Sequence, residues 1–124
     1  MRTLLTNRGV EDESEKEIFL NPNYETGLHD PFLMKDMDKA ISRFLDAISK
    51  NERIVIFTDY DTDGLPAAAM FHDFFKKIGY ENFENYIPHR HGEGFGLNKQ
   101  AIDTLKENNA VLILTADCGV TNHE

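Results

Sequence analysis

Asp59, Asp61 and Asp63 alternate with other residues in a short segment that ends in glycine. The run Ile-Val-Ile-Phe-Thr at 54–58 comes directly before them and has the β-branched and aromatic character of a buried strand. Three carboxylates in one turn repel one another unless a multivalent cation or strong hydrogen-bond donors compensate. Carboxylate oxygens favour Mg²⁺, Mn²⁺ or Ca²⁺. The segment therefore predicts a divalent-cation site, with a solvated acidic turn as the alternative.

Helical and strand patterns alternate around this turn. The expected elements are a helix over 34–48, a strand over 54–57, a helix over 66–78, a strand over 85–88, a helix over 98–108 and a strand over 111–115. Their order predicts an α/β fold, a three-layer Rossmann-like arrangement around a parallel sheet. We expect residues 1–33 to form an irregular leader segment and residues 34–124 to form the α/β domain.

Asp117 follows the last expected strand, within Thr-Ala-Asp-Cys-Gly at 115–119. In open parallel sheets, ligands bind beyond the carboxyl ends of the strands. If the two strands are neighbours, Asp117 faces the first acidic segment; the alternative is a turn residue before Gly119. Four carboxylates around one point would hold one metal ion and help to hold two. Two ions about 4 Å apart would activate a water and stabilise the leaving oxygen in phosphodiester cleavage.

Two other protein classes share parts of the acidic segment. The aspartate spacing matches the opening half of a calcium-binding EF-hand loop, but Met70 stands where a bidentate glutamate is required and Pro66 is also out of place. In haloacid-dehalogenase-like phosphatases, Asp61 would be the nucleophile and Asp63 the acid/base. A hairpin flap usually follows that motif, whereas an alanine-rich helix is expected here. Both readings are therefore minor alternatives.

Composition limits the remaining possibilities. The 124 residues are 40% hydrophobic, which suits one small domain with a core. The net charge of −9 should repel nucleic acid and anionic membranes, so an anionic substrate needs metal or local cations. The single cysteine, Cys118, excludes an internal disulfide and favours a cytoplasmic location. No apolar run approaches the roughly 20 residues that span a bilayer.

Several separated segments together point to a known family. They are Leu4-Leu5, Asn7-Arg8-Gly9, Phe19-Leu20, Pro22, Leu28, Asp30-Pro31, Asp36-Met37, Ala40 and Arg43 in the leader, then Asp59 to Gly64, Ile87 to Arg90, Gly94 to Leu97 and Thr115 to Gly119. In this order they resemble the amino-terminal part of RecJ-type single-stranded-DNA exonucleases of the DHH phosphoesterase superfamily. The resemblance extends over nearly the whole chain.

The resemblance implies Mn²⁺- or Mg²⁺-dependent hydrolysis of phosphodiesters, stepwise from the 5′ end of single-stranded DNA, in repair and recombination. By analogy Asp61, Asp63 and Asp117 are direct metal ligands and catalytic residues, and the complete family site holds two ions. Asp59 is a metal-site residue that binds directly or orients another ligand.

The segment 89–96 supplies the expected contacts to nucleic acid. Arg90 is the best candidate for a phosphate contact because its fork holds two oxygens. His89 and Gly94 are assigned to the same surface, where glycine lets the backbone approach the strand. His89 and His91 could also bind metal, although exposed loop histidines are commoner. Cys118 is expected to be a small buried residue, not a nucleophile.

The chain also departs from the family. The Asp-His-His motif, a further metal-binding aspartate and the carboxyl-terminal substrate-binding domain do not occur in these residues. We therefore expect a fragment with little or no nuclease activity alone and a sheet edge open to self-association. Two alternative functions stay open. One is a DHH-type phosphodiesterase acting on short oligonucleotides or cyclic dinucleotides, against which the leader at 4–43 argues; the other is a non-catalytic metal-binding or interaction module.

Overall fold

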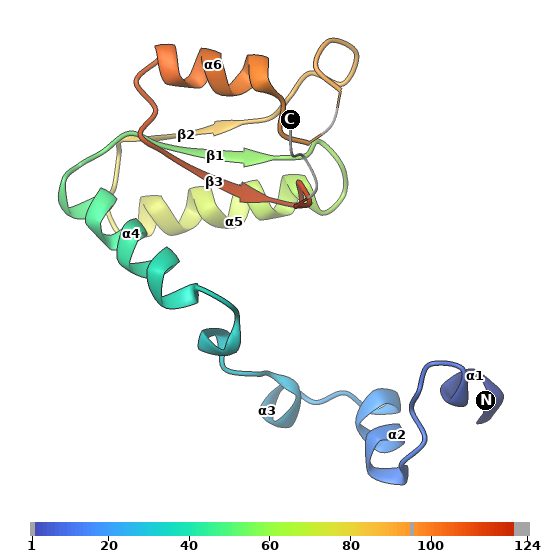
Figure 1. Ribbon diagram of the computed structural model, residues 1–124. Helices are drawn as coiled ribbons and strands as arrows, with labels where there is room; N and C mark the ends of the chain where they lie inside the picture. The colour runs from blue at the N-terminus through green and yellow to red at the C-terminus, as the bar shows by residue number, and fades with distance from the viewer. Residues whose placement is uncertain (1, 95, 121–124) are drawn as a thin grey trace. The chain divides into compact units, whose positions relative to one another are not determined.

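A computed structural model describes residues 2–94 and 96–120 (Figure 1). The chain divides into two compact units, Met1–Asp38 and Lys39–Glu124. None of the helices in the described part of the chain is long and apolar enough to cross a lipid bilayer.

The first unit contains short helices where the sequence led us to expect irregular chain. They are α1 (Arg2–Thr6), α2 (Glu13–Leu20), α3 (Tyr24–Gly27) and the 3₁₀ turn η1 (Pro31–Leu33). The last three begin at caps whose side chains accept backbone N–H bonds: Asp12 from Ser14 and Glu15, Asn23 from Glu25, and Asp30 from Phe32. Such local bonds form short helices without a core. Leu5 is the one buried side chain among the described residues of this unit.

The second unit is built on a three-stranded parallel sheet. Its strands are β1 (Ile54–Thr58), β2 (Phe83–Tyr86) and β3 (Leu112–Ala116), in the spatial order β2-β1-β3. The helices are α4 (Met37–Ser49), which begins just before the unit boundary, α5 (Gly64–Lys77) and α6 (Lys99–Glu107). Figure 1 shows α5 and α6 on opposite faces of the sheet. The expected α/β fold with a parallel sheet between helical layers is confirmed.

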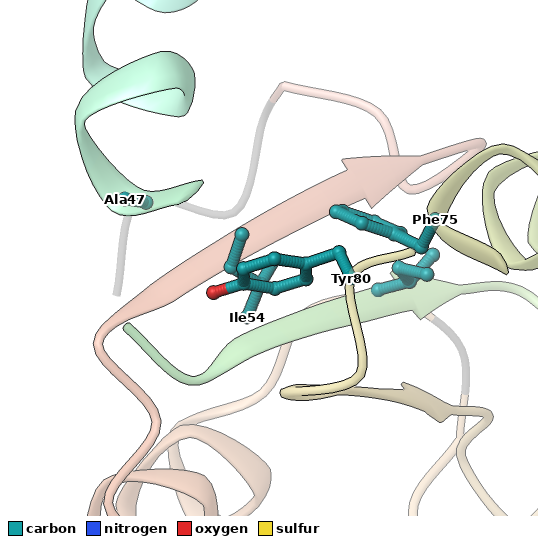
Figure 2. Close-up of a cluster of buried hydrophobic side chains, with 5 residues drawn as sticks. Ala47, Ile54, Phe75 and Tyr80 are labelled. Carbon is teal, nitrogen blue, oxygen red and sulfur yellow. The ribbon is translucent and has the colours of Figure 1, made fainter. Parts of the chain in front are cut away.

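All five residues of β1 are fully buried because both faces of this central strand are covered. Successive side chains point to opposite faces. Ile54 and Ile56 pack with Ala47 of α4 and Phe75 of α5, in the cluster of Figure 2. On the other face, the two remaining apolar residues of β1, Val55 and Phe57, pack with Ala101 and Leu105 of α6. The strand that leads into the acidic turn is therefore held from both sides.

Several element bounds differ by one to three residues from the expected ones, and two of these differences have a local cause. The helix expected from residue 34 begins at Met37, because η1 ends at Leu33 and Asp36 has a φ of 59°, outside the helical region. The second strand lies at 83–86 instead of 85–88. Phe83 is part of it because its ring stacks on that of Phe75, with 4.7 Å between centroids. The helix expected after Asn98 is confirmed, and the Asn98 side chain caps it through Ala101 N–H at 2.8 Å.

The core predicts a clear difference between two neighbouring phenylalanines. Phe75 is fully buried, whereas Phe74 is 43% exposed on the same helix. We expect Phe75→Ala to lower the free energy of unfolding by about 3–5 kcal/mol, through lost burial and a cavity. Phe74→Ala should cost clearly less. Urea unfolding followed by circular dichroism measures both, and equal losses would contradict this account of the core.

Candidate metal centre

The pairing of β1 with β3 brings two acidic turns to one edge of the sheet. Thr58 lies opposite Ala116 in the parallel register. Asp59 and Asp117 are the next residues along the chain, so the two turns begin at equivalent positions of neighbouring strands. One carboxylate oxygen from each of Asp61, Asp63 and Asp117 lies within 4.8 Å of the others, and all three residues are exposed. Three oxygens this close together form a donor set suited to a hard divalent cation.

Gly64 makes the first turn possible. Its N–H donates to Asp61 Oδ1 at 3.1 Å, and the residue is buried. A Cβ at this position would lie 2.2 Å from the carbonyl oxygen of Asp59. No side chain fits at that distance, so the chain can fold back from β1 into α5 only with glycine here. The same N–H belongs to the first turn of α5, whose partial positive charge favours a carboxylate.

The pKa values of Asp61 and Asp117 are shifted in opposite directions. The hydrogen bond from Gly64 N–H, the largest cause, lowers the pKa of Asp61. The pKa of Asp117 is raised, first by a side-chain hydrogen bond with Asp61, then by desolvation and by repulsion from Asp63, Asp61 and Asp59. Of the two, Asp117 is thus the more easily protonated and Asp61 the more acidic. A bound cation would favour the ionised form of both and offset the repulsion among the carboxylates.

Asp117 also fits the turn alternative considered from the sequence. Its φ is 59°, in the left-handed region that aspartate adopts more readily than most residues, and Gly119 follows with a φ of 67°. The chain turns directly after β3, and the carboxyl group of Asp117 stays at the sheet edge beside Asp61. Being a turn residue and being a ligand candidate are compatible at this position.

Asp59 lies outside the three-carboxylate cluster. It is half-buried, and its Oδ1 accepts the N–H of Tyr60 at 2.7 Å. Its charge still acts on the cluster, because repulsion from Asp59 contributes to the raised pKa of Asp117. Cys118 is half-buried, with its Sγ 3.6 Å from the carbonyl oxygen of Phe57. Burial, followed by repulsion from the two neighbouring aspartates, raises the pKa of the Cys118 thiol, which disfavours the thiolate form that a nucleophile needs.

The loop between β2 and α6 brings Arg90 next to the acidic turn. The guanidinium carbon of Arg90 lies 5.0 Å from the ring centroid of Tyr60, a cation–π contact. His89 and His91 are exposed, with 6.0 Å between their ring centroids. Neither belongs to the metal-ligand grouping found in the described part of the chain. Gly94 has a φ of 77° in the same loop.

Two residues of this region have no signal in the sequence that indicates their contacts. Tyr60 stands between Asp59 and Asp61, and a single tyrosine at this position does not by itself predict a partner. Glu93 is one of 22 acidic residues and has no motif spacing, so only its contacts in the fold distinguish it. Both of its carboxylate oxygens accept hydrogen bonds within the loop.

The sequence of this chain is similar to one known family and to several known proteins. Residues 53–124 match the family described as "DHH family, N-terminal domain". The chain is 39% identical over 119 residues to the single-stranded-DNA-specific exonuclease RecJ of Bacillus subtilis, which covers 95% of this chain and 15% of that protein. For RecJ of Escherichia coli the identity is 27% over 123 residues, 99% of this chain and 20% of the relative. For RecJ of Thermus thermophilus it is 33% over 90 residues, 73% and 13%. The chain therefore spans at most a fifth of the length of these relatives.

The steric argument for Gly64 is testable with one methyl group. Gly64→Ala forces the new Cβ against the Asp59 carbonyl, so the turn must shift; we expect a loss of about 1–3 kcal/mol in the free energy of unfolding. Gly27→Ala is the matched control, since nothing lies within 4 Å of its added Cβ and its φ is not positive. Denaturant unfolding of both variants measures the difference. Unchanged stability of Gly64→Ala would refute the close approach.

Proposed function

This chain belongs to the DHH family, and on that premise we propose that it supplies part of the metal-binding centre of a phosphodiesterase of the RecJ type. The reaction is hydrolysis of single-stranded DNA from its 5′ end, in repair and recombination. The observation that carries the proposal is the meeting of Asp61, Asp63 and Asp117 within 4.8 Å, from two turns far apart in the sequence. A solvated acidic turn would not require the second of these turns.

The donor set fits Mn²⁺ or Mg²⁺, because both ions prefer carboxylate oxygens. Asp61, Asp63 and Asp117 would hold the ion, and Asp59 would orient the turn through its bond to Tyr60 N–H. The bound metal supplies Lewis-acid stabilisation and a water of lowered pKa. The chain's own part is to hold three carboxylates at one point, two of them on the turn that Gly64 fixes and the third on the turn after β3.

Arg90 is the positively charged side chain that we assign to the substrate beside this centre. The chain carries a net charge of −9, so a phosphate approaches only where local positive charge outweighs that repulsion. The guanidinium group of Arg90 lies over the ring of Tyr60, which is itself a residue of the acidic segment. We assign it to a phosphate of the single strand, with His89 and the backbone at Gly94 beside it on the same loop.

The described residues provide one grouping of three carboxylates, which is enough for one ion and too few ligands for two. We therefore infer that these 124 residues bind one ion and show little or no nuclease activity by themselves. The names of the relatives favour single-stranded DNA over short oligonucleotides or cyclic dinucleotides as the substrate. A purely non-catalytic metal-binding module remains the second candidate, which the same cluster would serve.

Mn²⁺ titration by calorimetry tests the centre. We expect Asp61→Asn to weaken binding by about tenfold or more, because it removes one charged ligand. Asp103→Asn is the matched control: it removes an exposed carboxylate on α6 and should leave Mn²⁺ binding unchanged. Equal affinities for all three proteins would mean that the cluster is a solvated acidic turn.

The same preparations are then given 5′-labelled single-stranded DNA with Mn²⁺. No release of label is the expected result for these residues alone. Release by the unaltered chain but not by Asp61→Asn would show that the three carboxylates suffice for catalysis and would refute the inference of a partial centre.

The free edge of β3 supports a further proposal, self-association. In the described sheet, β3 pairs with β1 on one side only, which leaves backbone groups of its other edge available. We expect a concentration-dependent rise in mass by light scattering. A constant monomer mass up to high concentration would exclude this proposal. The cytoplasmic location inferred from the cysteine content stays a prediction.

A further inference from the structure

We propose that Glu93 is a positioning residue: it fixes the loop between β2 and α6 so that Arg90 lies against Tyr60, beside the acidic turn. Its use for binding a phosphate rests on the function proposed above, whereas the positioning itself does not. Sequence patterns gave no reason to select this residue, and the family resemblance assigned it no role.

Both carboxylate oxygens of Glu93 are engaged within the loop. Oε2 accepts the backbone N–H of His89 at 2.7 Å, and Oε1 accepts the hydroxyl of Tyr86. The backbone closes the same turn, since the N–H groups of Gly92 and Glu93 both donate to the carbonyl oxygen of His89, at 3.0 and 2.9 Å. Arg90 lies inside this closed turn, directly after His89. Its backbone is thus held by main-chain and side-chain bonds together.

Tyr86 connects the turn to the centre of the sheet. It is the last residue of β2 and pairs in register with Phe57 of β1. The two rings stack with 5.1 Å between centroids, and Phe57 is fully buried. Glu93 is therefore attached, through the Tyr86 hydroxyl, to β2, which pairs with β1, the strand that leads to Asp59 and Asp61. The loop with Arg90 and the acidic turn share one rigid support.

The protonation states agree with these bonds. The backbone hydrogen bond from His89, followed by the bond from Tyr86, lowers the pKa of Glu93, so it is an ionised double acceptor at neutral pH. The hydrogen bond to Glu93, with burial, raises the pKa of Tyr86 to about 12, so its hydroxyl remains a donor. Hydrogen bonds to an ionised acceptor are stronger than neutral ones.

A carboxylate close to a phosphate site repels the phosphate. Here the charge of Glu93 is compensated by two hydrogen-bond donors, and the two bonds make the loop more rigid. The loop contains glycines at 92, 94 and 96, which leave the free backbone many conformations. Fixing Arg90 before an anion arrives lowers the entropy lost on binding.

The test uses Glu93→Ala, Glu93→Gln and the control Glu107→Gln, an exposed residue at the end of α6. The readout is the nuclear Overhauser effect between the Arg90 side chain and the Tyr60 ring, with β1 amide shifts as a check that the sheet is intact. We expect the signal to vanish in Glu93→Ala, weaken in Glu93→Gln, which keeps one acceptor oxygen, and persist in the control. Its full retention in Glu93→Ala overturns the proposal.

A double-mutant cycle separates positioning from general stability. With a 5′-phosphorylated oligothymidylate and Mn²⁺, Arg90→Ala should lower affinity about tenfold, as for one charged hydrogen bond. Glu93→Ala as a single change should weaken binding of the oligonucleotide, but adding it to Arg90→Ala should have no further effect. The affinity for Mn²⁺ should be unchanged in both cases. Independent, additive losses contradict the proposal. If the unaltered chain binds no oligonucleotide, the assignment of Arg90 to a phosphate of the single strand fails, and the Overhauser measurement still decides the role of Glu93.

Discussion

The parallel pairing of β1 with β3 is the constraint on which the candidate centre depends. It sets Thr58 opposite Ala116, and so fixes where the two acidic turns begin. Burial of every β1 residue makes this pairing hard to shift, because a one-residue change of register would move Ile54 and Ile56, and likewise Val55 and Phe57, out of the clusters in which they are packed. The hydrophobic core thus holds groups together that repel one another at the surface.

That repulsion is balanced locally by a few backbone groups. The N–H of Gly64 stabilises the charge of Asp61, while the hydrogen bond with Asp61 and the nearby carboxylates raise the pKa of Asp117. On the neighbouring loop, Glu93 and Tyr86 hold the segment that carries Arg90. The carboxylates and Arg90 are therefore held by separate sets of hydrogen bonds, on loops that extend from the same sheet around β1. A centre of this kind is arranged before its ligand arrives, which reduces the cost of binding.

Much of this arrangement could be predicted from the sequence. The buried run before Asp59 and the alternation of helices and strands indicated a parallel sheet, and that topology placed Asp117 near the first turn. The helices of the leader segment were harder to predict, since they depend on single caps such as Asp12 and not on apolar periodicity. The start of β2 at Phe83 depends on packing against Phe75, which no local pattern reveals. The two hydrogen bonds that Glu93 accepts could not be predicted either, because only the folded loop brings their donors next to this side chain.

The most direct test of the central claim is paramagnetic broadening of backbone amide signals during addition of Mn²⁺. If one ion binds between the two turns, the signals of residues 61–64 and 117–119 should broaden together, at the same low ratio of metal to protein. Broadening confined to residues 59–64, with 117–119 unaffected, would contradict a centre shared by the ends of β1 and β3.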